Sequence, residues 1–109
     1  MTPDLSALID ALSRTRALLS RYGDTWVAGR LAELETRLAT GDVSAVESAV
    51  SEATGGMGSL NDRRLSTANG DRVEAADEHE VNVQLRSLVR ETERAARAAA
   101  AQLGLSLHR

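Results

Sequence analysis

The segment GGMGSLND (residues 55–62) is the one place in this chain where the sequence indicates special backbone geometry. It places three glycines within four residues, after a helical pattern and before a stretch without periodicity. Glycine adopts backbone conformations that other residues avoid, so the segment predicts a sharp change of chain direction. The predicted structural loop comprises Gly55, Gly56, Met57 and Gly58.

A backbone cradle for an anion is the alternative interpretation of this segment. Nucleotide-binding loops place their glycines after a strand and before a helix, usually with a lysine. Here the glycines follow a helical pattern, and the chain contains no lysine. We therefore expect one of the first two glycines to take the left-handed position that ends a helix, with the methionine turned into the core. Polar side chains would close the turn, and the predicted partner-binding residues are Ser59, Asn61 and Asp62.

Three helical patterns precede the segment and are separated by two Gly-Asp pairs, Gly23-Asp24 and Gly41-Asp42. Each pair joins a residue that ends helices to one that caps the next helix. The resulting helices are expected over about residues 2–22, 24–40 and 43–53. Two such boundaries in a short chain predict a series of helical hairpins.

Trp26 and Gly29 lie near the start of the second predicted helix, and the tryptophan is one of only two aromatic residues in the chain. A buried indole removes about 150–250 Å² of surface from water. We expect Trp26 to be the largest contributor to the core, and Gly29 to let a neighbouring helix approach closely.

Periodicity disappears between residues 57 and 73, where Asn69-Gly70 is a hairpin signal with short, polar flanks. From about residue 75 to residue 103 the apolar positions hold a heptad-like spacing, and Gly104 predicts the helix end. The fold class expected is mainly α, a four-helix single domain over residues 1–109 with three shorter helices and one long carboxyl-terminal helix. An irregular segment or small β-hairpin is expected at about residues 55–73, and a frayed tail at 104–109.

A row of arginines follows one face of the long helix at spacings of four, four and three: Arg86, Arg90, Arg94 and Arg97. Such a row fits phosphates or an acidic partner. It also fits a solvated face in which Glu93 pairs with Arg97 one turn away, and we favour that interpretation.

Patterns that would indicate catalysis or metal binding are weak. The chain has no cysteine, so disulfides and thiolate metal sites are excluded. His79 lies in an acidic run without a second histidine one turn away, and His108 lies in the predicted tail. We therefore predict no catalytic residue, no metal and no cofactor, and we expect a non-enzymatic protein.

Composition limits the classes of partner. The net charge is −3, which argues against nucleic acid, and the scarcity of aromatics argues against a base-stacking platform. No apolar run approaches the roughly 18 residues of a membrane span, and no signal pattern opens the chain. We expect a cytoplasmic protein with no membrane partner. All thirteen basic residues are arginine, a usage typical of GC-rich bacterial genomes.

The string GGMGSLND, with RYGDTW upstream and Asn-Gly before a long helix downstream, resembles an uncharacterised family of short bacterial helical proteins. In that family a Gly-Gly-Met-Gly-Ser-aromatic/apolar-Asn-Asp segment recurs in mid-chain, and the likeness covers about residues 22–88. Leu60 stands here at the aromatic position, and Arg63-Arg64 follows where the family continues apolar. The resemblance implies a helical fold and no particular activity.

The function expected on these grounds is protein interaction without catalysis, and an immunity protein that neutralises a bacterial toxin is one concrete form. The alternative is a small ligand-binding or enzymatic domain that uses residues 55–62. The expected partner is another protein. A homodimer stays open if part of the Ala/Leu face of the long helix is exposed.

Overall fold

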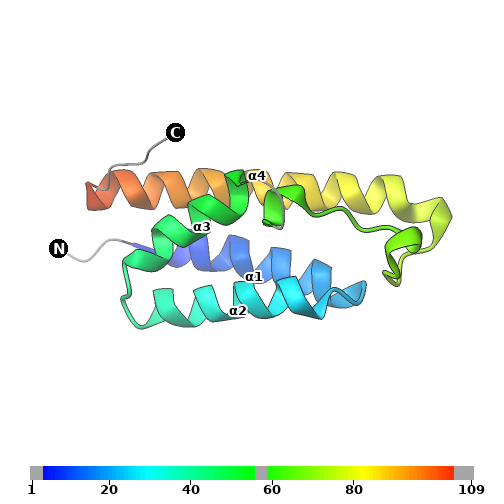
Figure 1. The fold of residues 1–109 in the computed structure, drawn as a ribbon. Helices are drawn as coiled ribbons and strands as arrows, with labels where there is room; N and C mark the ends of the chain where they lie inside the picture. The colour runs from blue at the N-terminus through cyan, green and yellow to red at the C-terminus, as the bar shows by residue number, and fades with distance from the viewer. Residues whose placement is uncertain (1–3, 56–58, 105–109) are drawn as a thin grey trace.

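The structure, a computed structural model, describes residues 4–55 and 59–104. Within them it contains four α-helices, three short 3-10 turns and no β-strand (Figure 1). The helices are α1 (Ser6–Arg21), α2 (Thr25–Ala39), α3 (Ser44–Thr54) and α4 (Glu78–Leu103). The turns are η1 (Leu60–Asp62), η2 (Thr67–Asn69) and η3 (Ala75–Asp77). The expected four-helix, mainly α fold with a long last helix is confirmed.

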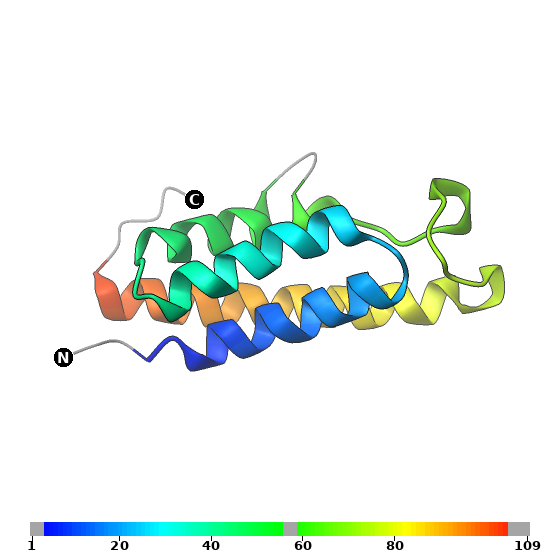
Figure 2. The same ribbon diagram turned by 90° about the horizontal axis from the view of Figure 1, so that it is seen from below.

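The helices form an elongated bundle. Helix α1 runs antiparallel to α2 and α4 and contacts both, while the short α3 lies against α4 (Figures 1 and 2). At 1.5 Å per residue the 26 residues of α4 span about 39 Å, close to the longest dimension of the molecule, 47 Å. The chain between η1 and η3 extends along α4 to the far end of the bundle (Figure 2).

Both Gly-Asp pairs end one helix and begin the next, as predicted. Gly23 and Gly41 each have φ of +87°, the left-handed conformation that glycine adopts without strain. The Asp24 carboxylate accepts a hydrogen bond from the Val27 N–H at 3.2 Å, and the Asp42 carboxylate accepts one from the Ser44 N–H at 3.0 Å. The first turn of each following helix therefore has a capped donor.

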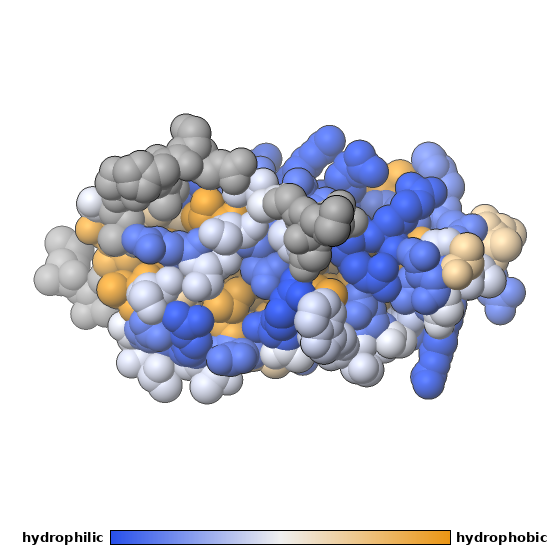
Figure 3. All heavy atoms as spheres, in the orientation of Figure 1, coloured by the Kyte–Doolittle hydropathy of each residue, from blue (hydrophilic) through white to orange (hydrophobic). Residues whose placement is uncertain are grey.

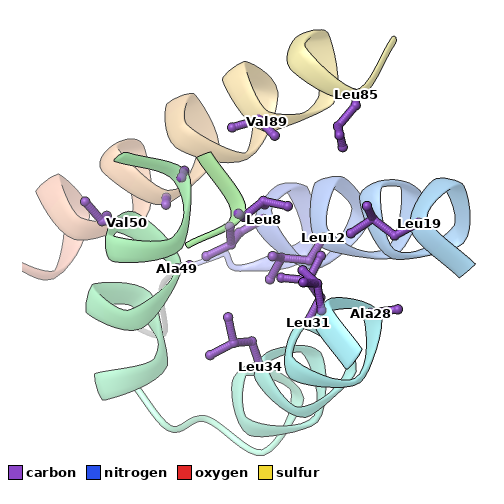
Figure 4. Close-up of a cluster of buried hydrophobic side chains, with 14 of the residues drawn as sticks. Leu8, Leu12, Leu19, Ala28, Leu31, Leu34, Ala49, Val50, Leu85 and Val89 are labelled. Atoms are coloured by element: carbon purple, nitrogen blue, oxygen red, sulfur yellow. The ribbon is translucent and has the colours of Figure 1, made fainter. Parts of the chain in front are cut away.

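The core is aliphatic and is formed by leucine, valine and alanine from all four helices, including Leu8, Leu12, Leu31 and Val50 (Figure 4). The heptad-like spacing of the long helix predicted Leu88 as one of its core positions. At this turn of α4 the buried residue is Val89, and Leu88 is only partly buried, so that prediction was wrong by one residue. Three more apolar side chains enter the core from outside the helices: Leu60, Leu65 and Val73.

Two predictions for α2 were wrong. Trp26 is 71% exposed, and the buried residues of this part of α2 are Val27, Ala28 and Leu31. A Cβ atom at Gly29 would meet nothing within 4 Å, so no neighbour approaches that glycine. The apolar stripe of α2 begins one residue after the tryptophan, and Trp26 therefore points away from the bundle.

The irregular alternative, and not the hairpin, describes residues 59–73. Gly70 does have a positive φ, +83°, but it closes the single turn η2 by donating its N–H to the Thr67 carbonyl at 3.0 Å. The flanks are joined by isolated contacts and not by a strand ladder: the Asp71 N–H donates to the Ser66 carbonyl at 3.2 Å, and the Thr67 hydroxyl donates to the Val73 carbonyl at 2.7 Å. Leu65 and Val73 both pack in the core, and the side-chain amide of Asn82 hydrogen-bonds the backbone of Leu65.

Candidate functional site

The predicted loop is described in part. Gly56, Met57 and Gly58 lie outside the described residues, as does the side chain of Asp62. Gly55 has φ of −73° and ψ of 177°, an extended conformation, so the expected left-handed position does not fall on this glycine. Its lack of a side chain serves another purpose, because a Cβ atom would lie 2.4 Å from the Ser51 carbonyl oxygen.

Residues 59–64 leave this turn and are anchored at two points. The first anchor is Leu60, whose side chain is fully buried and whose N–H donates to Glu52 Oε1 at 2.9 Å. Glu52 is also paired through both oxygens with the guanidinium of Arg30, at 2.9 Å for each contact. One carboxylate of α3 therefore joins α2 to η1.

Arg63 is the second anchor. Its guanidinium donates to the carboxylates of Asp24 and Asp71, both nearly buried, and the contact with Asp71 measures 2.6 Å. Burial alone would lower the pKa of Arg63, but the hydrogen bonds and charges of the two aspartates outweigh it and raise the pKa. Arg63 stays charged and ties residues 63 and 71 to the start of α2.

Two concavities flank residues 59–64 and share Arg63 and Arg64 as lining residues. The arginine groove, about 460 Å³, lies between η1 and α4; its lining is Leu60, Asn61, Arg63, Arg64, Asn82, Leu85, Arg86, Val89, Arg90 and Glu93. The tryptophan groove, about 430 Å³, lies toward α2; its lining is Asp24, Trp26, Val27, Ser59, Arg63, Arg64 and Asn69. The shared arginines make the two grooves one surface.

The predicted partner-binding residues divide between these grooves. Ser59 is half-buried and lines the tryptophan groove. Asn61 is exposed and lines the arginine groove, and its Nδ2 donates to the Gly55 carbonyl at 3.4 Å, which supports the expected turn-closing role. Two of the three positions therefore lie on one surface.

Sequence reasoning missed Trp26 as a surface residue. The Arg30 guanidinium lies 4.7 Å from the centroid of the indole, a cation–π distance. Because Glu52 holds Arg30 through both oxygens, the cation beneath the ring is itself fixed. The i,i+4 spacing of tryptophan and arginine in a helix was the available indication.

The arginine row does not act as one unit. Arg97 pairs with Glu93 at 2.9 Å, as predicted. Arg86 and Arg90 line the arginine groove, whereas Arg94 is exposed and does not. Figure 3 shows strongly hydrophilic side chains gathered where residues 59–73 extend along the amino-terminal half of α4.

The site has the groups of a recognition surface: guanidiniums, amides, a hydroxyl and an indole. Across residues 4–55 and 59–104, no three histidine or acidic side chains come together as metal ligands. In the same ranges, no helix combines the length and the apolar character that crossing a bilayer requires.

Comparison with protein-family models, curated proteins and solved structures gives no match to this chain. The resemblance to an uncharacterised bacterial family stays a prediction.

Proposed function

We propose that this chain is a non-enzymatic protein-interaction domain that binds its partner through the tryptophan groove and its border. The observation that carries the proposal is the 71% exposure of Trp26, the only tryptophan in a chain whose core is aliphatic. Tryptophan and arginine are the residues most enriched among those that dominate binding energy at protein interfaces.

The setting of Trp26 supports this function. Immobilising a mobile side chain on binding costs about 0.5–1.5 kcal/mol, and a side chain that is already ordered avoids part of that cost. The stack on Arg30 at 4.7 Å, with Arg30 held by Glu52, orders the indole in the free protein. Around it lie polar groups suited to an interface border, among them Ser59, Arg64 and Asn69.

The test is affinity capture from the source cells with the full chain as bait, followed by titration of the captured protein. Trp26→Ala should weaken binding by roughly 30-fold or more, equivalent to about 2 kcal/mol, with the helical content unchanged. The matched control is Val43→Ala, which removes another exposed apolar side chain (44%) directly before α3, outside both grooves. Equal affinity for both variants would contradict the proposal.

An immunity protein that neutralises a bacterial toxin is the specific form we propose to test once a partner is captured, by co-expression and growth. The same proposal includes a cytoplasmic location and leaves homodimerisation to be measured by sedimentation.

A further inference from the structure

The arginine groove carries an excess of unpaired positive charge. Four of its ten lining residues are arginine and one is acidic. Within the groove Arg63 is neutralised by Asp24 and Asp71, and Glu93 is neutralised by Arg97. Among the described residues, no ion pair is formed by the other three: Arg64, Arg86 and Arg90. The groove therefore has three guanidiniums that form no ion pair, beside an Arg63 cluster whose formal charge with its two aspartates is −1. Arg64 also interacts electrostatically with Glu78, so the charges of Arg86 and Arg90 are the least compensated.

These charges come from two elements separated in sequence. Arg64 follows η1, and Arg86 and Arg90 lie one turn apart on α4, so the groove has cations on both of its sides. Like charges at i,i+4 spacing destabilise a helix. An anion bound between Arg86 and Arg90 relieves that repulsion, so anion binding stabilises the helix.

The groove also has apolar lining residues. Leu60, Leu85 and Val89 line it and are 0–7% exposed, and Asn82 has its amide committed to backbone groups of residues 65 and 78. An occupant thus meets mainly guanidiniums and amides, with a small aliphatic contribution from Val89. Guanidinium groups bind carboxylates through paired hydrogen bonds.

We propose that the arginine groove binds a short acidic segment of the partner protein, with carboxylates on Arg86, Arg90 and Arg64 and an apolar side chain over Val89. This inference rests on the proposed function, which it deepens by naming the chemistry of the partner. The net charge of −3 favours a short acidic segment over an extended polyanion such as nucleic acid, because the rest of the surface repels a long chain of negative charge.

The probe is a fluorescein-labelled peptide of sequence Glu-Leu-Glu-Glu-Leu-Glu, measured by anisotropy with the full-length chain at low salt. Arg86→Glu and Arg90→Glu should each weaken binding at least tenfold. Arg94→Glu is the matched control: it makes the same charge change on the same helix outside the groove, and it should weaken binding less than threefold. A peptide with glutamine in place of glutamate should not bind.

The remaining outcomes separate this inference from its competitors. If Arg94→Glu and Arg90→Glu weaken hexapeptide binding equally, the peptide is attracted to the charge of the whole helix, and the assignment to the groove is overturned. A labelled DNA duplex that binds more tightly than the peptide would overturn the acidic-segment assignment. So would inorganic phosphate that raises the melting temperature as much as the peptide does, since it would indicate a small-anion site.

The two proposals fail in different ways. Trp26→Ala should leave the hexapeptide affinity unchanged, because the hexapeptide needs only the arginine groove. Partner capture that depends on Trp26 but not on Arg86 or Arg90, with no hexapeptide binding, would retain the proposed function and overturn this inference. Hexapeptide binding that depends on Arg90, together with partner binding that Trp26→Ala does not change, would overturn the proposed function and retain the arginine groove as an acidic-peptide site.

Discussion

Asn82 and Leu65 form the pair of hydrogen bonds that usually joins two strands. Asn82 Oδ1 accepts from the Leu65 N–H at 2.8 Å, and Asn82 Nδ2 donates to the Leu65 carbonyl at 2.7 Å. Both residues are buried, so no strand and no solvent is needed to satisfy these backbone groups. One side chain of α4 thus substitutes for a neighbouring strand.

Replacing this amide should be costly. Asn82→Ala leaves a buried donor and a buried acceptor of Leu65 without partners, and we expect a loss of about 2–4 kcal/mol in the free energy of unfolding, measured in urea. Asn82→Asp keeps an acceptor for the N–H but cannot donate from an ionised carboxylate, so at pH 7 it should also destabilise. A loss below about 0.5 kcal/mol for Asn82→Ala would contradict the pairing.

Gly55 and Gly29 should respond in opposite directions to the same substitution. Gly55→Ala places a Cβ atom 2.4 Å from the Ser51 carbonyl oxygen, and the backbone must shift. We expect it to lower stability by more than about 1 kcal/mol. Gly29→Ala meets no atom within 4 Å inside a helix and should raise stability by about 0.5–1 kcal/mol. Thermal melts of the two variants check the difference in sign.

Glu52 should matter to stability through two contacts at once. Glu52→Ala removes the partner of Arg30 and the acceptor for the Leu60 N–H, and we expect a loss of about 1–3 kcal/mol. Glu52→Gln retains an acceptor and should lose less. The same variants should loosen Trp26, which is measurable as a lower steady-state anisotropy of tryptophan fluorescence. Unchanged anisotropy in Glu52→Ala would argue against the ordering of the indole by Arg30.

Glu78 should contribute to the loss of stability in acid. A hydrogen bond from the Thr67 N–H to Glu78 Oε1, 2.8 Å long, is the main cause that lowers the pKa of this carboxyl below its ordinary value; a hydrogen bond with Ser66 adds to it. A lowered native pKa means that the unfolded chain takes up the proton first. This contribution is therefore present above about pH 4.5 and is lost as the pH falls through the lower native pKa. Unfolding curves from pH 7 to pH 3 should show a shallower acid decline in Glu78→Gln; parallel declines would contradict the assignment.

Local rules in the sequence predicted the helices well. Gly-Asp pairs act within a few residues of themselves, so the ends of α1 and α2 followed from the sequence, as did the long α4. The path of residues 59–73 did not, because its anchors are contacts between distant residues, such as Arg63 with Asp24 and Asn82 with Leu65. Neither composition nor periodicity indicates which distant residues form such contacts.

The predicted partner-binding residues and the candidate surface overlap in part. Ser59 and Asn61 line the two grooves, but the tryptophan was assigned to the core because aromatic residues are usually buried. The buried positions of α2 begin at Val27, one residue after the tryptophan, so Trp26 falls on the exposed face of the helix. The register of this apolar stripe predicts the exposure of Trp26 better than its residue type does. Arg86 and Arg90 line a groove and Arg94 does not, because residues 59–64 lie beside only the first two. The path of that segment cannot be predicted from periodicity.

The way residues 59–77 are held has a dynamic consequence. Few of their side chains enter the core. Glu52, Asn82 and Glu78 accept hydrogen bonds from their backbone, and Asp24 binds the side chain of Arg63. Segments with few apolar contacts open at lower free energy than the helices around them. Amide hydrogen exchange should therefore find this stretch opening as one cooperative unit while the bundle stays closed. Because both grooves are built on it, an occupant of either groove slows exchange along its whole length.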